Sequence, residues 1–250
     1  MNDDLDEAIA RNRRGQLVGL AFLAAVILIA VVVGSGAFSG DDPAKDASVV
    51  QGVKGTKETT ALLRGIPQNG MVLGDPDAPV TVVEFVDVKC PNCKSFVLKD
   101  GPRIVRDLVR TGKANLEMRM LAGLGPDSPL GRTAVFGASA QGRAWNLAEL
   151  LFYNQKSEGL KWVTPALLQK IGGVAPELRG TPILTAPTPA TTRLSSESEA
   201  LKVQLGVKGT PTVFVRRRGT TAPGDYRKVD LNGTGSRAGK VIDAVSDLAG

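Results

Sequence analysis

The distribution of apolar and charged positions separates an N-terminal stretch from the rest of the chain. Residues 17–38 (LVGLAFLAAVILIAVVVGSGAF) carry no charge, and about 20 such residues in a helix span roughly 30 Å, the thickness of a bilayer's hydrocarbon core. Arg11, Arg13 and Arg14 precede this stretch, and Asp41 and Asp42 follow it. The positive-inside rule therefore predicts a cytoplasmic N-terminus (1–16), a transmembrane anchor (17–38) and an extracytoplasmic C-terminal part, in a single-pass cell-membrane protein.

A cleavable signal peptide is the alternative interpretation of this stretch, with Ser35-Gly36-Ala37 as its cleavage site. Its apolar run is longer than the roughly 7–15 residues of a signal peptide, which favours a retained anchor. Residues 39–61 (SGDDPAKDASVVQGVKGTKETTA) are polar, Gly-containing and aperiodic. They predict a linker, so we expect the folded domain to cover residues 62–250.

The first half of this domain shows a strand–helix–strand pattern. Residues 71–73 form a short strand candidate, and 80–86 (VTVVEFV) is a run of β-formers typical of a strand buried on both faces. Residues 91–110 have apolar positions at helical spacing, with Gly101-Pro102 expected to kink the helix. Alternation over 115–120 predicts the next strand, parallel to the first through a right-handed crossover.

The second half is first helical and then returns to strands. Helical spacing covers 128–141, 145–153, 165–171 and 195–205, whereas 172–192 is rich in Pro, Thr and Gly and gives no clear element. Strands are predicted at 212–215 and 226–231, and a closing helix at 236–248. The order β, βαβ, helical block, ββ, α predicts an α/β domain with a helical insertion at about 124–205.

Composition excludes several kinds of site. The chain has 250 residues, no His and only two Cys, so Ser-His-Asp hydrolases, Cys-His proteases, His-ligated metals and four-cysteine zinc sites are ruled out. The formal net charge of +6 would suit nucleic acid, but the predicted location outside the cytoplasm argues against that partner. We expect no metal.

The two cysteines, Cys90 and Cys93, lie in one turn directly after the strand at 80–86. If Cys90 caps the following helix, Pro91 takes the first helical position, and the N–H groups of Asn92 and Cys93 face the sulfur of Cys90. These N–H groups and the helix dipole lower the thiol pKa, and Lys89 and Lys94 add solvated positive charge nearby.

Cys93, one turn further on, is expected to lie deeper than an exposed Cys90. That arrangement gives an attacking thiol and a resolving thiol, as disulfide exchange requires. An inert structural disulfide is the alternative, but a bridge that closes so small a loop removes little chain entropy. The redox interpretation is therefore favoured.

Several motifs together resemble the membrane-anchored DsbA-like thiol–disulfide oxidoreductases of the thioredoxin superfamily. They are GDPDAPV, Glu84-Phe85, Asp87, the CPNC sequence at 90–93, the helical QGRAWNLAELLFYNQ and, far downstream, GVKGTPTVFV. The resemblance covers roughly residue 65 to the C-terminus. It implies a thioredoxin-like fold with a helical insertion and a redox-active cysteine pair that needs no cofactor.

The resemblance also implies roles for residues outside the cysteine turn. Thr210-Pro211 corresponds to the family's cis-proline loop, whose backbone holds an extended substrate peptide beside the cysteines. Glu84 corresponds to a buried acid; as a half-buried carboxyl with a raised pKa it would take the proton of Cys93. A solvent-facing Glu84 is the alternative, and Asp87, on the opposite face of the strand, is a rival candidate.

The implied activity is disulfide formation in exported unfolded or cysteine-containing proteins, with a membrane-embedded redox partner that reoxidises the cysteines. The turn departs from the strongest oxidants of the family at Asn92, where a His is common; we therefore expect a less oxidising pair. Two other hypotheses stay open. One is a reductase or isomerase kept reduced by a membrane electron donor, and the other is a non-catalytic, membrane-tethered peptide-binding module.

Overall fold

The computed structural model describes residues 42, 44–45 and 47–249. The predicted anchor at 17–38 and the cytoplasmic segment at 1–16 lie outside these residues. Within the described part of the chain, none of the helices combines the length and apolar character needed to cross a bilayer. Residues 43–250 group as one compact unit.

The elements of this unit are numbered along the chain, with η1 and η2 as π-helical turns and η3 and η4 as 3-10 turns. They are β1 (Val49–Val50), β2 (Val53–Lys54), α2 (Thr56–Leu63), β3 (Gln68–Asn69), β4 (Val72–Leu73), β5 (Val80–Val86), α3 (Pro91–Ser95), η1 (Phe96–Asp100), α4 (Gly101–Ile104), η2 (Val105–Val109), β6 (Ala114–Met120), α5 (Ser128–Ser139), α6 (Ala144–Tyr153), α7 (Pro165–Val174), η3 (Pro176–Leu178), α8 (Pro189–Gln204), β7 (Thr212–Arg217), η4 (Pro223–Asp225), β8 (Arg227–Val229) and α9 (Arg237–Ala249).

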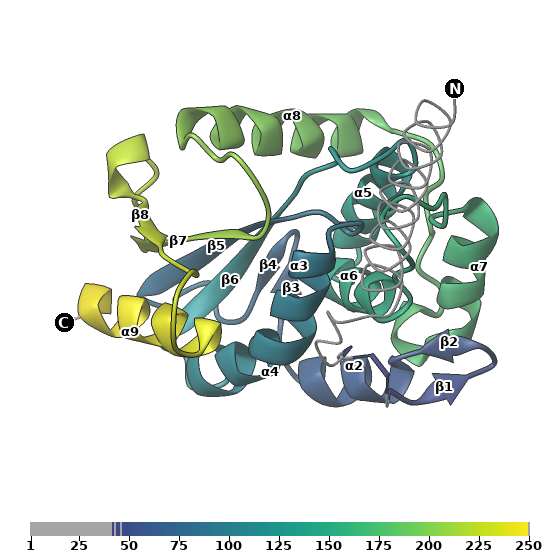
Figure 1. Cartoon of the computed structure of the whole chain (residues 1–250), viewed down its shortest axis with the longest axis horizontal. Coiled ribbons are helices and arrows are strands. Elements are labelled where there is room, and N and C mark those ends of the chain that lie inside the picture. The colour runs from purple at the N-terminus through teal and green to yellow at the C-terminus, as the bar shows by residue number, and fades with distance from the viewer. Residues whose placement is uncertain (1–41, 43, 46, 250) are drawn as a thin grey trace, which may run out of the picture. The chain divides into compact units, whose positions relative to one another are not determined.

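The main sheet has the strand order β3-β4-β6-β5-β7-β8 (Figure 1). β5 and β6 pair in parallel, from Val80 opposite Ala114 to Val86 opposite Met120, as the sequence predicts. β7 lies antiparallel on the other side of β5. β5 is therefore an interior strand with both edges paired, and all seven of its residues are buried.

Alternation along β5 divides its side chains between two hydrophobic cores. Val82 and Val86 belong to the larger core, which α3, α4, α6 and α9 also line. Val83 and Phe85 belong to a smaller core, against which Leu201 of α8 packs. Figure 1 shows α8 on one side of the sheet and α4 and α9 on the other.

The segment 49–63 corrects the linker prediction for residues 39–61. β1 and β2 form a small antiparallel hairpin, and α2 follows and packs against α6. Val53 is fully buried, and the side chains of Thr56 and Thr59 are buried as well. These small β-branched residues carry too weak an apolar pattern for the sequence to show that they are packed.

The helical insertion consists of α5 to α8, close to the predicted limits of about 124–205. α8 begins at Pro189, six residues before the predicted helix start at 195. The side chain of Thr188 caps it by accepting a hydrogen bond from the N–H of Thr191. The Pro-rich segment 172–192 thus contains the end of α7, the turn η3 and a helix start with proline at its first position.

The helix after β5 is irregular in its winding. The predicted interruption at Gly101-Pro102 takes the form of π-helical turns on either side of α4. A proline cannot donate an N–H to the preceding turn, and a local change of helical pitch accommodates the loss.

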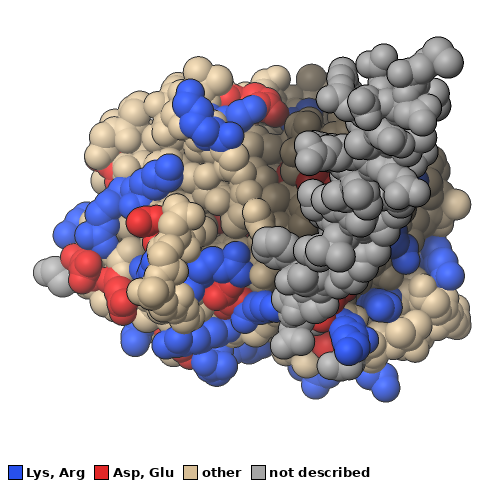
Figure 2. Space-filling model, viewed as in Figure 1, with Lys and Arg blue, Asp and Glu red and all other residues tan. Residues whose placement is uncertain are grey.

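Charged side chains on the face shown in Figure 2 are mixed in sign. Lys and Arg side chains lie over the region of β8, α9 and α4, with Asp and Glu among them. On this face, the positive charge is thus spread over the surface and interleaved with acidic groups.

Candidate active site

Cys90 is the N-cap of α3, as predicted. Its backbone is extended, Pro91 occupies the first helical position, and its sulfur accepts a hydrogen bond from the N–H of Cys93 at 3.4 Å. The hydrogen bond to the Cys93 thiol lowers the pKa of Cys90 most; burial opposes this, and the side chain of Thr210 and the N–H groups of Cys93 and Asn92 lower it further. The pKa of Cys90 falls from 9.0 to about 6, so the thiolate predominates at neutral pH.

Cys93 has the opposite electrostatic environment. Its side chain is fully buried, and burial raises its pKa well above 9.0, with a further contribution from Cys90. Both cysteines are present as free thiols. The predicted asymmetry between the thiols holds in pKa, but Cys90 is not an exposed residue, because only 5% of it is accessible.

The Thr210-Pro211 loop covers Cys90. The peptide bond between the two residues is cis, and the Cys90 thiol donates a hydrogen bond to the carbonyl oxygen of Thr210 at 3.3 Å. The sheet explains this contact between residues 120 positions apart: β7 starts at Thr212, which pairs with Phe85 near the end of β5. Both segments therefore reach the same end of the sheet.

Pro91 and Asn92, between the cysteines, are exposed. The helix start accordingly presents its outer surface, formed by Pro91 and Asn92, to solvent while the two sulfurs face inward.

Glu84 lies in β5 on the same face as Val82 and Val86, under the helix that carries the cysteines. It is 5% exposed, so it is buried, not half-buried as the sequence suggests, and the solvent-facing alternative is wrong. Burial raises its pKa from 4.5 to about 8. Among the described residues, its Oε1 atom has no hydrogen-bond partner. A carboxyl group with this pKa can release a proton near neutral pH and, once ionised, take one up again.

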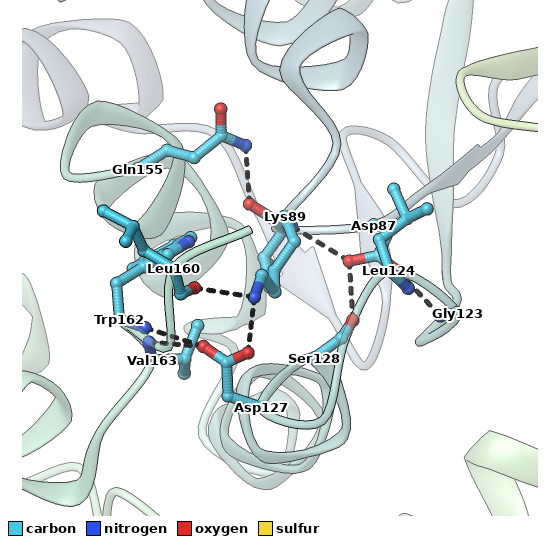
Figure 3. Close-up of polar contacts among 11 residues, drawn as sticks. Asp87, Lys89, Gly123, Leu124, Asp127, Ser128, Gln155, Leu160, Trp162 and Val163 are labelled. Carbon is cyan, nitrogen blue, oxygen red and sulfur yellow. Dashed lines mark hydrogen bonds and ion pairs between the residues drawn. The ribbon is translucent and has the colours of Figure 1, made fainter. Parts of the chain in front are cut away.

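Asp87, the rival acid, has a structural role in the loop before Cys90 (Figure 3). Its Oδ1 atom accepts hydrogen bonds from the Lys89 N–H at 2.9 Å and the Ser128 hydroxyl at 2.6 Å. Its Oδ2 atom accepts from the N–H groups of Gly123 and Leu124 at 2.9 and 3.2 Å. Both oxygens are thus engaged, which fixes the loop and leaves Asp87 poorly suited to carry protons.

Lys89 is not a solvated side chain, contrary to the sequence-based expectation. It is 1% exposed, and its ammonium contacts Asp127 Oδ1 at 2.5 Å and the carbonyl of Leu160 at 2.9 Å (Figure 3). Burial would raise the pKa of Asp127, but the hydrogen bonds from Lys89 and from the N–H groups of Val163 and Trp162 lower it. This buried ion pair connects the cysteine loop to the helical insertion.

Gln155, just after α6, completes these connections. Its side-chain amide donates hydrogen bonds to the carbonyls of Val88 at 2.7 Å and Cys90 at 3.1 Å. Sequence reasoning missed Gln155, Asp127 and the buried position of Lys89. Their spacing along the chain carries no signal, and only the position of Lys89, three residues after the buried run at 80–86, could have suggested burial.

Two surface depressions adjoin this site. One of about 490 Å³ is lined by Lys89, residues 123–126 and 158–159, and Lys161. The other, of about 310 Å³, is lined by Pro211, Thr212 and residues 228–232. Among the described residues, there is no group of three or more Cys, Asp or Glu side chains arranged to hold a metal ion.

Comparison with known proteins relates this chain to the thioredoxin family. A family model described as thioredoxin matches residues 67–230. Disulfide bond formation protein D of Bacillus subtilis is 29% identical over 161 residues, which is 63% of this chain and 72% of that protein.

Solved structures are similar at the level of the fold. The crystal structure of oxidised BdbD from Bacillus subtilis superposes with a TM-score of 0.56 at 23% identity, covering 74% of this chain and 97% of that one. Alpha-DsbA1 of Wolbachia pipientis has a TM-score of 0.56 at 17% identity, covering 76% and 95%. The fold is therefore the thioredoxin-like α/β fold with a helical insertion that the sequence predicts.

Proposed function

This chain belongs to the thioredoxin family, and we propose that it forms disulfide bonds in exported proteins through the Cys90/Cys93 pair. Its similarity to a disulfide bond formation protein supports a protein-disulfide oxidoreductase activity. The cysteine pair is itself the redox centre, so the reaction needs no other cofactor.

The opposite pKa shifts of the two thiols carry this proposal. A Cys90 thiolate with a pKa of about 6 is a good leaving group and stabilises the reduced enzyme, whereas Cys93 stays protonated. A structural disulfide would gain nothing from such a difference. The cis Thr210-Pro211 loop contacts the thiol of lower pKa, where a substrate sulfur must arrive.

The proposed reaction starts from the Cys90–Cys93 disulfide. A substrate thiolate attacks the Cys90 sulfur, the bond between the two cysteines breaks, and Cys93 leaves and takes up a proton supplied by Glu84. A second thiol of the substrate, as its thiolate, then attacks the substrate sulfur of the mixed disulfide, and Cys90 leaves as a thiolate. Two electrons pass from the substrate to the enzyme, and the substrate gains one disulfide.

We assign substrate binding to Thr210 and Pro211. An extended peptide that pairs with the Thr210 backbone would place its cysteine beside Cys90, by the strand-addition mode common in peptide recognition. The adjoining depression at Pro211, Thr212 and residues 228–232 would receive its neighbouring side chains. The substrates are then unfolded or flexible exported proteins that contain cysteine.

An oxidase must itself be reoxidised. We propose that residues 17–38 anchor the chain in the cell membrane, with the C-terminal domain outside, and that a membrane-embedded redox partner accepts the electrons. Protease treatment of intact cells should digest the domain after residue 38. Without protease, the full chain should stay in the membrane fraction. Release of the untreated full-length chain by alkaline carbonate would contradict the anchor.

The activity test uses the full chain with its disulfide formed and a reduced peptide that contains two cysteines. We expect one peptide disulfide per chain and none with Cys90→Ser. Reduced Cys93→Ser, given the same peptide in its disulfide form, should be trapped as a mixed disulfide, because its Cys90 thiolate attacks the peptide disulfide, one peptide thiol leaves, and no second enzyme thiol resolves the bond. Arg218→Ala, a change in an exposed ion pair with Asp77, serves as the matched control and should leave the yield unchanged. Peptide oxidation that persists in Cys90→Ser would refute the proposal.

Direction is tested in cells by trapping the free thiols with an alkylating reagent of known mass. An oxidase keeps Cys90 and Cys93 mostly as a disulfide at steady state. A mostly alkylated pair would identify a reductase or isomerase. A phenotype that Cys90→Ser leaves intact would identify a binding module.

A further inference from the structure

Glu149, on α6, is a second buried acid that the proposed reaction does not use. It lies in a stretch whose other residues form the core, and only 4% of it is exposed. Among the described residues, its Oε2 atom has no hydrogen-bond partner. A carboxyl group buried without a partner is costly, so a core position of this kind calls for an explanation.

Glu149 and Glu84 line the same small cavity. The cavity has a volume of about 20 Å³, which is enough for one water molecule. Its other lining residues are apolar, aromatic or Gly, among them Leu116 and Trp145. A water molecule in this cavity would find its side-chain hydrogen-bond partners in the two carboxyl groups.

The cavity lies about one helical turn beyond Cys93. Phe96 and Val97, which line it, follow Cys93 by three and four residues, so they lie on the same face of the helix one turn further along. The two acids therefore come from different elements, β5 and α6, and meet under the helix that carries the resolving thiol.

We propose that Glu149 is a positioning residue of this site, whose carboxyl group exchanges a proton with that of Glu84 across the cavity and thereby sets when Glu84 can give a proton to Cys93. The proposal rests on the proposed disulfide exchange. When Cys93 leaves the disulfide as a thiolate, Glu84 gives it a proton and becomes a carboxylate. The still protonated Glu149 then shares that single negative charge, and a proton from solvent restores the pair.

The electrostatics of the surrounding groups agree with this coupling. Burial, with a smaller contribution from the charge of Glu84, raises the pKa of Glu149 to about 8. Tyr153, also on α6, is a titratable group that interacts with Glu149. Burial raises the pKa of Tyr153, with contributions from the charges of Glu149 and of Glu58 on α2.

The first test follows the carboxyl carbons of both acids by NMR in the reduced full chain. We expect the pair to titrate in two steps at least about one pH unit apart, with both steps visible at both residues. Glu149→Gln should leave Glu84 with a single step, and Glu149→Asp should restore the second. A Glu84 curve that is the same in the wild type and in Glu149→Gln would overturn the proposal.

The second test measures how fast a thiol peptide reduces the oxidised chain between pH 5 and pH 9, with rates divided by those of Glu84→Gln. Glu149→Gln should move the midpoint of this profile by about one pH unit. Added to Glu84→Gln, the same change should alter the reduction rate less than twofold. Asn146 is on α6 like Glu149 and accepts a hydrogen bond from Gln68 of β3. Asn146→Ala removes that bond and should not move the midpoint.

The two tests separate failure of this inference from failure of the proposed function. The NMR titration requires no catalysis, so coupled carboxyls in a chain without exchange activity would leave only the function refuted. Coupled carboxyls together with an unchanged rate profile in Glu149→Gln would overturn the role of Glu149. An active chain with independent carboxyls would overturn it as well.

Discussion

The buried carboxyl group of Glu84 makes the stability of the protein depend on pH. Its pKa is 4.5 when exposed and about 8 in the folded chain, so the folded state binds more protons than the unfolded state between these values. The contribution of Glu84 to folding stability is therefore fully present below pH 4.5 and is lost as the pH rises towards and through 8. Each pKa unit corresponds to about 1.36 kcal/mol.

Glu84→Gln removes this penalty while preserving the size of the side chain. At pH 7 the carboxyl group of Glu84 is ionised in the unfolded chain but protonated in the folded chain, and this difference lowers the unfolding free energy by about 3 kcal/mol. The difference in unfolding free energy between Glu84→Gln and the wild type should therefore increase by about 3 kcal/mol from pH 4.5 to pH 7. Any constant cost of burying the Gln amide cancels in this comparison.

Urea unfolding of the reduced full chain, followed by tryptophan fluorescence, measures the effect. Trp145 and Trp162 are both buried and are the only two in the chain. Glu58→Gln is the control with the opposite sign: burial raises the pKa of Glu58, but hydrogen bonds from Ser48 lower it overall, so wild-type Glu58 stabilises above pH 4.5. Parallel pH curves for the wild type and Glu84→Gln would refute the argument, because they would mean that Glu84 is solvated.

Three further predictions concern the cysteine turn and the loop before it. The alkylation rate of Cys90 should rise with a midpoint near pH 6, and Cys93→Ala should move this midpoint upward, because the hydrogen bond to the Cys93 thiol contributes most to the lowered pKa; an unchanged midpoint would contradict this cause. Lys89→Met should cost about 3–5 kcal/mol in urea unfolding, because it leaves Asp127 buried without its cation, whereas a cost below about 1 kcal/mol would mean that the pair is solvated. Asp87→Asn should cost about 2 kcal/mol by removing acceptors from the loop, while Asp75→Asn in an exposed turn should stay within about 0.5 kcal/mol; equal effects would contradict the structural role of Asp87.

The sequence predicted those elements whose pattern is strong. The run at 80–86 became β5 with the same limits, because a nearly continuous run of β-formers favours a strand buried on both faces. The Cys90-Pro91 pair marked a helix start, because a proline at the first helical position loses no hydrogen bond. The hairpin and helix at 49–63 were missed, since their burial depends on contact with α6 and leaves little periodicity.

The candidate site was predictable only where one residue type carries the chemistry. Two cysteines three residues apart identify themselves, and the Thr210-Pro211 motif identified the loop that covers them. Glu149 gave no such signal, because one acid in an apolar helix looks like a solvated residue until the helix is placed against β5. The same holds for Lys89, whose partner Asp127 lies 38 residues away and on another element.

The buried contact between Lys89 and Asp127 has a consequence for engineering. The insertion cannot be treated as a separable module, because shortening it to obtain a minimal scaffold would remove Asp127 and leave the ammonium group of Lys89, the residue before the reactive cysteine, without its carboxylate partner. A redesign that trims these helices must exchange Lys89 for a neutral side chain in the same step and must find new donors for the carbonyls now bound by Gln155.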